Sequence, residues 1–183
     1  MQDVKTIDKI SGEVASAVFL RGDLAKLTPT ELVHHYFAVC DSLGLNRLTK
    51  PFEYITLNGK LTLYATRNCT DQLRKLYGIS IKIIDRRMQD DMLVVHAEAT
   101  IKATQRQDED FGVVPLYPSI KGEQRSNQIM KCITKAKRRV TLSICGLSFL
   151  DESEIESIPA AAKSAPAANR VLDSALEEAN DPS

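Results

Sequence analysis

The sequence predicts an α+β fold, in which a largely antiparallel sheet with one hairpin packs against a long basic C-terminal helix and shorter helices. Segments that alternate between apolar and polar residues occupy the middle of the chain, between residues 53 and 117. Helical patterns precede, interrupt and follow them, and the longest begins at Ser126. The order helix, hairpin, helix, further strands and long helix is typical of α+β proteins.

Length and composition are those of an ordinary soluble protein. The chain has 183 residues, of which 43% are hydrophobic and 26% charged, enough for one domain with a substantial core. No apolar run is long enough to span a membrane, and no signal peptide is expected before residue 30. The four cysteines form no C-x-x-C pair, which favours reduced, mostly buried thiols in a cytoplasmic protein.

The first secure element is a helix that follows a weakly patterned N-terminal arm, residues 1–27. Thr28 as N-cap, Pro29 at the first helical position and Glu31 at the third make a capping box. Apolar residues then recur at helical spacing until Gly44, which is expected to end the helix.

A β-hairpin and a short helix come next. The alternating segments Glu53–Leu57 and Lys60–Thr66 flank an Asn-Gly dipeptide, which is the strongest short-range hairpin signal. Thr70 is expected to cap a short helix that ends at Gly78.

Three further strands are expected before the long helix. Ile79–Asp85 and Asp91–Ala103 are rich in β-branched residues and alternate, around a charged turn at Arg86–Asp90. A polar loop, Gln105–Asp110, then precedes the last strand, Phe111–Tyr117. The proline in this last strand predicts an edge strand or a broken one.

The long helix, with Ser126 as its N-cap and Gly146 as its C′ residue, has two different faces. Helical spacing places its apolar residues on one side, where they can dock on a sheet. The opposite side is a cationic stripe of Lys131, Lys135, Arg138 and Arg139. A solvated amphipathic surface helix is the alternative interpretation of this pattern.

Charge is strongly segregated along a chain whose net charge is zero. Residues 121–139 carry seven basic residues and one acid, whereas residues 151–183 carry eight acids and two basic residues. A row of cations at helical spacing matches the phosphates of a nucleic-acid backbone. We expect a DNA-binding core at 28–158 and, after an Ala/Pro-rich linker, a flexible acidic tail at 159–183.

Earlier in the chain, cationic residues are interleaved with tyrosines, and this pattern also predicts binding of nucleic acid. Cations attract phosphates, and aromatic side chains can stack on unpaired bases. Ordinary core or cross-strand packing is the alternative explanation for each tyrosine. The nucleic-acid-binding candidates outside the stripe are Arg67, Arg74, Lys75, Arg125 and Tyr64.

No enzyme site is expected. The glycines form neither a dinucleotide-binding motif nor a Walker loop, and the three histidines are not at zinc-ligand spacing with cysteines. Asp108, Glu109 and Asp110 are a conceivable Mg²⁺ site, but a solvated acidic turn between two strands is the favoured interpretation.

Two stretches of the chain resemble the bacteriophage RecT/Redβ family of single-strand annealing proteins. LGLNRLTKPFEYITLNGKLTLYATRNCTDQLRKLYGISI (Leu43–Ile81) is similar to the conserved block of that family. TKAKRRVTLSICGLSFLDESEIESI (Thr134–Ile158) is similar to its closing helix, glycine and short acidic segment.

The resemblance implies ATP-independent binding of single-stranded DNA and annealing of complementary strands in homologous recombination. It implies a homo-oligomer, a ring or a filament, with a continuous positive groove that places Lys135, Lys137, Arg138 and Arg139 towards phosphates. The implied partners are the annealed duplex intermediate, a phage exonuclease and a host single-strand binding protein. It implies no membrane and no cofactor, with Mg²⁺ modulating DNA binding, and a nucleoid-associated place in the bacterial cytoplasm.

Three other functions remain open at this point. A duplex-binding regulator or nucleoid protein would use the basic helix over residues 126–146 in a major groove and would need base-reading side chains there. An interaction protein would use the same helix to bind an acidic partner. A metal-dependent nuclease would rest on the carboxylates of residues 108–110.

Overall fold

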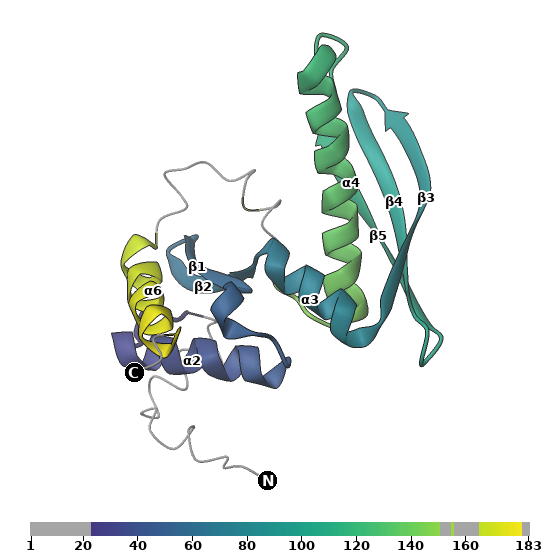
Figure 1. Ribbon diagram of the computed structural model, residues 1–183. Coiled ribbons are helices and arrows are strands. Elements are labelled where there is room, and N and C mark those ends of the chain that lie inside the picture. The colour runs from purple at the N-terminus through teal and green to yellow at the C-terminus, as the bar shows by residue number, and fades with distance from the viewer. Residues whose placement is uncertain (1–22, 151–154, 156–164, 181–183) are drawn as a thin grey trace. The chain divides into compact units, whose positions relative to one another are not determined.

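The fold is α+β, with two antiparallel sheets that lie in two compact units (Figure 1). The computed structural model describes residues 23–150, 155 and 165–180. The first unit contains the described residues up to Tyr64 together with 165–180, and the second contains those from Ala65 to residue 155. This division differs from the expected single core at 28–158, because the hairpin forms a sheet of its own. None of the described helices combines the length and apolar character that a membrane span needs.

The first unit contains the predicted capped helix and hairpin. In α2 (Pro29–Ser42) the capping box is confirmed: the Glu31 N–H donates to Thr28 Oγ1 at 3.4 Å, and the Thr28 N–H donates to the Glu31 carboxylate at 2.8 Å. A 3₁₀ turn, η2 (Arg47–Thr49), leads to β1 (Phe52–Leu57) and β2 (Lys60–Ala65). Asn58 and Gly59 both have positive φ, 50° and 76°, as a two-residue type I′ turn requires.

Residues 165–180 belong to this first unit and include a helix, α6 (Pro166–Asn180), where a flexible tail was expected. Asn169 explains part of the difference. Its amide accepts from the Tyr54 N–H at 2.9 Å and donates to the Tyr54 carbonyl at 3.0 Å, as a neighbouring strand would. Three apolar side chains of α6 are buried, namely Ala168, Leu172 and Leu176.

The end of the expected N-terminal arm is also part of the first unit. The Leu24 N–H donates to the Leu61 carbonyl at 2.8 Å, and the Leu61 N–H donates to the Asp23 carboxylate at 3.0 Å. The side chains of Leu24 and Leu27 are buried. The remainder of the arm, residues 1–22, lies outside the described residues.

The second unit is a three-stranded antiparallel sheet with helices on one side. It runs α3 (Arg67–Tyr77), β3 (Ile79–Gln89), β4 (Met92–Ile101), β5 (Arg106–Pro115) and α4 (Gly122–Ile144). The sheet order is β3-β4-β5, so Pro115 ends an edge strand, as its missing N–H predicts. The expected docking of α4 on the sheet is confirmed, and α4 runs along one sheet face (Figure 1). The core between them includes Val95, Ala97, Ala99, Val114, Cys132, Ala136 and Val140.

Two strands are longer than the sequence predicted. β3 continues through most of the expected turn Arg86–Asp90, after a bulge between Ile83 and Asp85. β5 includes nearly all of the expected loop Gln105–Asp110. Both errors have one cause: the consecutive charged residues of these segments suggest a turn or loop. In a strand their side chains instead alternate between the two faces, where tertiary partners or solvent accept them.

Two helices begin earlier than their predicted caps, and both end where predicted. Ser126 and Thr70 lie inside their helices, where their hydroxyls donate to the carbonyls of Gly122 and Arg67 at 3.4 and 3.1 Å. Gly78 ends α3 with φ 61°, and Gly146 follows α4 with φ 70°.

In the second unit, the backbones of α4 and β5 approach each other closely at Gly112. A Cβ atom at residue 112 would lie 2.4 Å from the Cys132 carbonyl oxygen and 2.6 Å from the Ala136 nitrogen. The Cys132 thiol lies 3.2 Å from the Gly112 carbonyl oxygen and 3.3 Å from that of Leu93, and burial raises its pKa. Only glycine therefore permits this spacing of helix and sheet.

We expect Gly112→Ala to lower the free energy of unfolding of the second unit by about 3 kcal/mol. The added methyl group would clash with backbone atoms of α4, which cannot move unless the helix shifts. Hydrogen exchange of the β4 amides would measure this, since these amides report on the second unit. Gly78→Ala is the control: it meets no atom within 4 Å but keeps a positive φ, so it should cost only about 1 kcal/mol. Equal effects of the two substitutions would contradict the packing argument.

Candidate functional site

A polar cleft lies between α3 and α4 in the second unit. It has a volume of about 250 Å³. Its lining side chains are Arg67, Asp71, Arg74, Thr134, Lys137 and Arg138. Four of them are cations and one is a carboxylate, so the lining carries a charge of +3.

Helical spacing on both elements brings these side chains together. On α3, Arg67, Asp71 and Arg74 follow each other at intervals of four and three residues and share a stripe, while Leu73 and Cys69 are buried elsewhere on the helix. On α4, the lining residues span positions 134–138, next to the face that covers the sheet. Cations from two helices that are distant in sequence therefore face one space.

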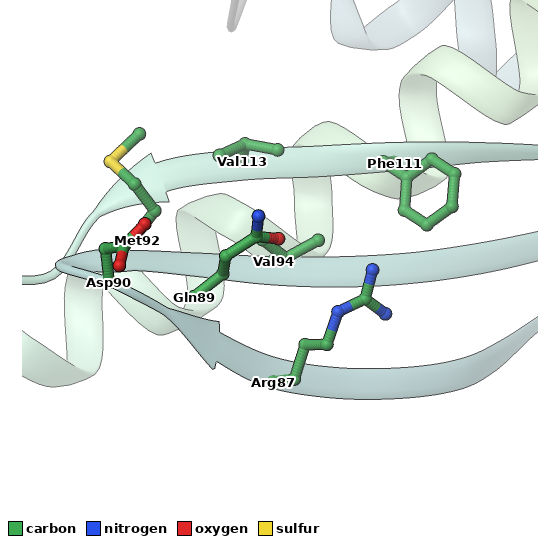
Figure 2. A pocket seen from close by; sticks show the side chains of 7 residues that line it. All are labelled: Arg87, Gln89, Asp90, Met92, Val94, Phe111 and Val113. Carbon is green, nitrogen blue, oxygen red and sulfur yellow. The ribbon is translucent and has the colours of Figure 1, made fainter.

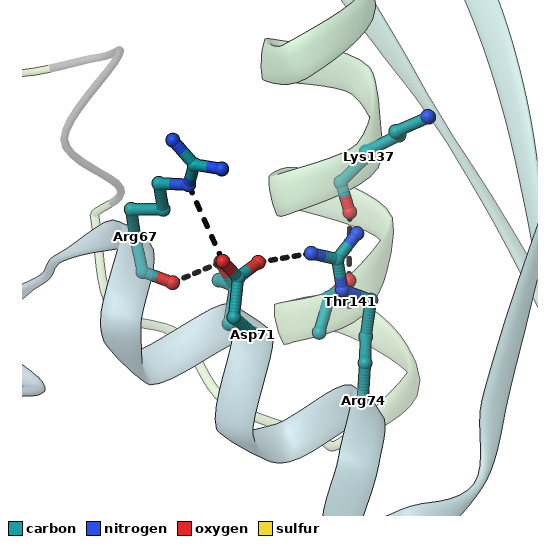
Figure 3. A network of polar contacts seen from close by, with 6 residues as sticks. Arg67, Asp71, Arg74, Lys137 and Thr141 are labelled. Atoms are coloured by element: carbon teal, nitrogen blue, oxygen red, sulfur yellow. Dashed lines mark hydrogen bonds and ion pairs between the residues drawn. The ribbon is translucent and has the colours of Figure 1, made fainter.

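Asp71 links the two arginines of α3 (Figure 3). One of its carboxylate oxygens accepts from Arg67 Nε at 3.3 Å, and the other accepts from Arg74 Nη2. On the α4 side, the hydroxyl of the buried Thr141 donates to the Lys137 carbonyl at 2.7 Å (Figure 3). The carboxylate thus orients two guanidinium groups at the rim of the cleft.

This arrangement suits an anion with several oxygens. Guanidinium groups form paired hydrogen bonds with phosphate, and a lysine ammonium adds an adaptable point charge. The lining holds four cations and one carboxylate, so an anion that contacts these cations gains Coulomb energy. The described residues of the cleft therefore have the chemistry of a phosphate-binding site.

Four of the sequence-predicted binding residues meet in the cleft: Arg67 and Arg74 from α3, and Lys137 and Arg138 from α4. Lys137 lies off the stripe expected on α4, but α3 packs on that side of the helix. Lys131 and Lys135 lie on α4 outside the lining of the cleft.

The other predicted residues lie elsewhere. Arg139 departs from the expected exposed stripe, because its Nε forms an ion pair with Asp110 of β5 at 3.2 Å. Lys75 is exposed on α3, and Arg125 is half-buried in the first turns of α4. Tyr64 belongs to the first unit, where its hydroxyl donates to the Glu53 carboxylate at 2.5 Å.

Asp71 and Thr134 are site residues that the sequence analysis missed. The spacing Arg67-Asp71-Arg74 is visible in the sequence and predicts one charged stripe on a helix. What the sequence did not reveal is that this stripe faces α4. The packing of α3 against α4 is a tertiary contact between segments more than forty residues apart.

The three carboxylates at residues 108–110 do not form a common site. They lie in a strand, so their side chains alternate between its two faces. Asp108 accepts from the Ser143 hydroxyl at 2.7 Å and Asp110 pairs with Arg139, whereas Glu109 contacts His96 at 2.9 Å. Within the described part of the chain, no group of three His, Cys, Asp or Glu residues is placed to hold a metal ion. The expected solvated turn at this position is thus replaced by a paired strand.

Comparison with protein-family models finds no match to this chain, and comparison with curated proteins finds no significant relative.

We expect Asp71→Asn to raise the affinity of the cleft for inorganic tripolyphosphate about fivefold, because the substitution removes a negative charge that opposes the ligand. Isothermal titration calorimetry at low salt would measure the change. Asp85→Asn is the matched control, since Asp85 forms a similar ion pair with Arg87 at 2.8 Å on β3. An equal gain in both variants would mean that only net charge matters, and would contradict a phosphate site at Asp71.

Proposed function

We propose that the protein binds single-stranded DNA through its phosphate backbone and anneals complementary strands without hydrolysing a nucleotide. The observation that carries the proposal is the cleft between α3 and α4, where Arg67, Arg74, Lys137 and Arg138 gather around a single carboxylate. Such a cluster contacts backbone and not base edges, and therefore binds without regard to sequence.

The resemblance to the RecT/Redβ family supports the proposal from a second direction. The two stretches that carry it, Leu43–Ile81 and Thr134–Ile158, contain the two walls of the cleft. Arg67 and Arg74 belong to the first stretch, and Lys137 and Arg138 to the second. The segments that are similar to the family are therefore those that bring the cations together.

The mechanism of annealing follows from electrostatics. Two complementary strands repel each other through their phosphates, and the rate of annealing is limited by the alignment of their bases in register. A cationic surface that holds the phosphates lowers this repulsion and leaves the bases accessible. Base pairing then supplies the free energy, so ATP is not needed. In this proposal no residue is catalytic, and Mg²⁺ acts only by screening phosphates.

The proposal also covers the oligomeric state of the protein, its partners and its location in the cell. Repetition of the cleft along a ring or filament of identical subunits would give a continuous groove for one strand. The partners would be a phage exonuclease that exposes single strands and a host protein that covers them, in the cytoplasm of the bacterial host near the nucleoid.

The direct test is the annealing of two labelled complementary oligonucleotides without ATP. We expect the protein to accelerate annealing, and expect Lys137→Ala/Arg138→Ala to reduce the rate about tenfold or more, because two phosphate contacts are lost. Lys131→Ala/Lys135→Ala is the matched control: it removes the same charge from the same helix, outside the cleft, and should retain most of the activity.

Three outcomes would contradict the proposal. If the wild-type protein does not accelerate annealing, the annealing function is wrong. If both double variants lose activity equally, net charge and not the cleft is responsible. A marked preference for duplex over single-stranded DNA would favour a duplex-binding regulator that uses α4.

A further inference from the structure

The sheet of the second unit has a second face, on the side away from α4. Side chains alternate along β5, so Gly112 and Val114 face α4 while Phe111 and Val113 face the other way. The strand register places Arg87 of β3 opposite Val94 of β4, and Val94 opposite Val113. These residues form one surface across all three strands.

A hollow of about 370 Å³ lies on this surface (Figure 2). Its apolar part is formed by Met92, Val94, Phe111 and Val113. Its polar part is formed by Arg87, Gln89 and Asp90, at the end of the β3–β4 hairpin. An apolar floor with a few polar groups on one side is typical of sites for small organic ligands.

Phe111 is held in place within this hollow, although 39% of its surface is exposed. One side of its ring stacks on His96, with ring centroids 4.5 Å apart and an interplanar angle of 20°. The orientation of His96 is in turn fixed by a hydrogen bond between its Nε2 and the Glu109 carboxylate, at 2.9 Å. Phe111 is therefore a supported aromatic platform.

Arg87 approaches the platform from β3, the opposite edge strand of the sheet. Its guanidinium carbon lies 6.0 Å from the centre of the Phe111 ring, and Figure 2 shows its side chain reaching towards that ring. The Asp85 carboxylate accepts from Arg87 at 2.8 Å, and this bond lowers the pKa of Asp85. A planar ligand stacked on the ring would thus have a charged donor beside it.

We propose that this hollow binds an unpaired nucleobase, which stacks on Phe111 and meets Arg87 at its edge. Every base has a π face, so aromatic stacking is tolerant of sequence, and a base that is paired within a duplex cannot stack in this way. The inference rests on the proposed function, because it takes the base to be part of single-stranded DNA. The platform and the cationic cleft lie on opposite sides of the sheet, so they contact different nucleotides.

A fluorescence experiment tests the platform independently of the phosphates. The chain contains no tryptophan, so Phe111→Trp creates a single fluorophore on the platform. Thymidine, which carries no phosphate, should quench this fluorescence saturably. Tyr77→Trp is the matched control, because Tyr77 is an aromatic residue of α3 with 45% exposure, outside the hollow. It should show only unsaturable, collisional quenching, and equal quenching of both variants would overturn the proposal.

A binding experiment tests the same site with DNA. The full chain should bind an oligothymidylate more tightly than an abasic strand of equal length, and Phe111→Leu should reduce that preference about tenfold. Phe111→Tyr should restore it, and Lys137→Ala/Arg138→Ala should weaken binding of both strands and leave their ratio unchanged.

The outcomes separate this inference from the proposed function. If neither strand binds but thymidine quenches the Phe111→Trp variant saturably, the proposed function fails and the base platform stands. If both strands bind equally to the wild-type protein, the platform fails and the cleft stands. An altered oligomeric state of Phe111→Leu with an unchanged preference would assign this face to contact between copies of the chain, and would overturn the proposal.

Discussion

The second unit depends on the close approach of α4 to β5 at Gly112. Because the helix backbone lies where a Cβ atom would otherwise be, α4 rests against the sheet at a fixed rotation, with Cys132, Ala136 and Val140 underneath. The rotation of α4 about its axis also determines what the other sides of the helix face. One flank contacts α3 and contributes to the cationic cleft, and the opposite flank brings Arg139 to Asp110. A packing constraint between backbones thus determines which cations are available to a ligand.

The cations of α3 and α4 differ in function because their acidic neighbours differ. Asp110 faces α4 from β5 and neutralises Arg139, so that arginine stabilises the packing of helix on sheet. Asp71 orients two arginines of α3 but is outnumbered by the positive charges of the cleft. The side chains that line the cleft thus carry more positive than negative charge, which favours an anionic ligand. Arg138 of the stripe expected on α4 joins Lys137 and two arginines of α3 in a compact cluster built from two helices.

Elements with strong local signals were predictable from the sequence, and those that depend on tertiary partners were not. The Thr28 cap, the Asn-Gly hairpin and the end of α4 at Gly146 are consequences of short-range chemistry, and all three are confirmed. β5 was predicted too short because aspartate is typical of loops. Asp108 lies in the strand because the Ser143 hydroxyl of α4 donates a hydrogen bond to its carboxylate, a tertiary contact that the sequence does not show. Four of the candidate binding residues line one cleft, but their meeting there requires the contact of α3 with α4, which the sequence does not reveal.

The central claim is that phosphates bind the cleft between α3 and α4. The salt dependence of binding to an oligothymidylate tests it most directly, because each neutralised phosphate of a single strand contributes about −0.7 to the slope of log K against log salt concentration. For the four cations of the cleft the account predicts a slope of about −2.8, reduced in magnitude by about 1.4 in Lys137→Ala/Arg138→Ala. An unchanged slope in that variant would show that phosphates bind elsewhere and would contradict the account.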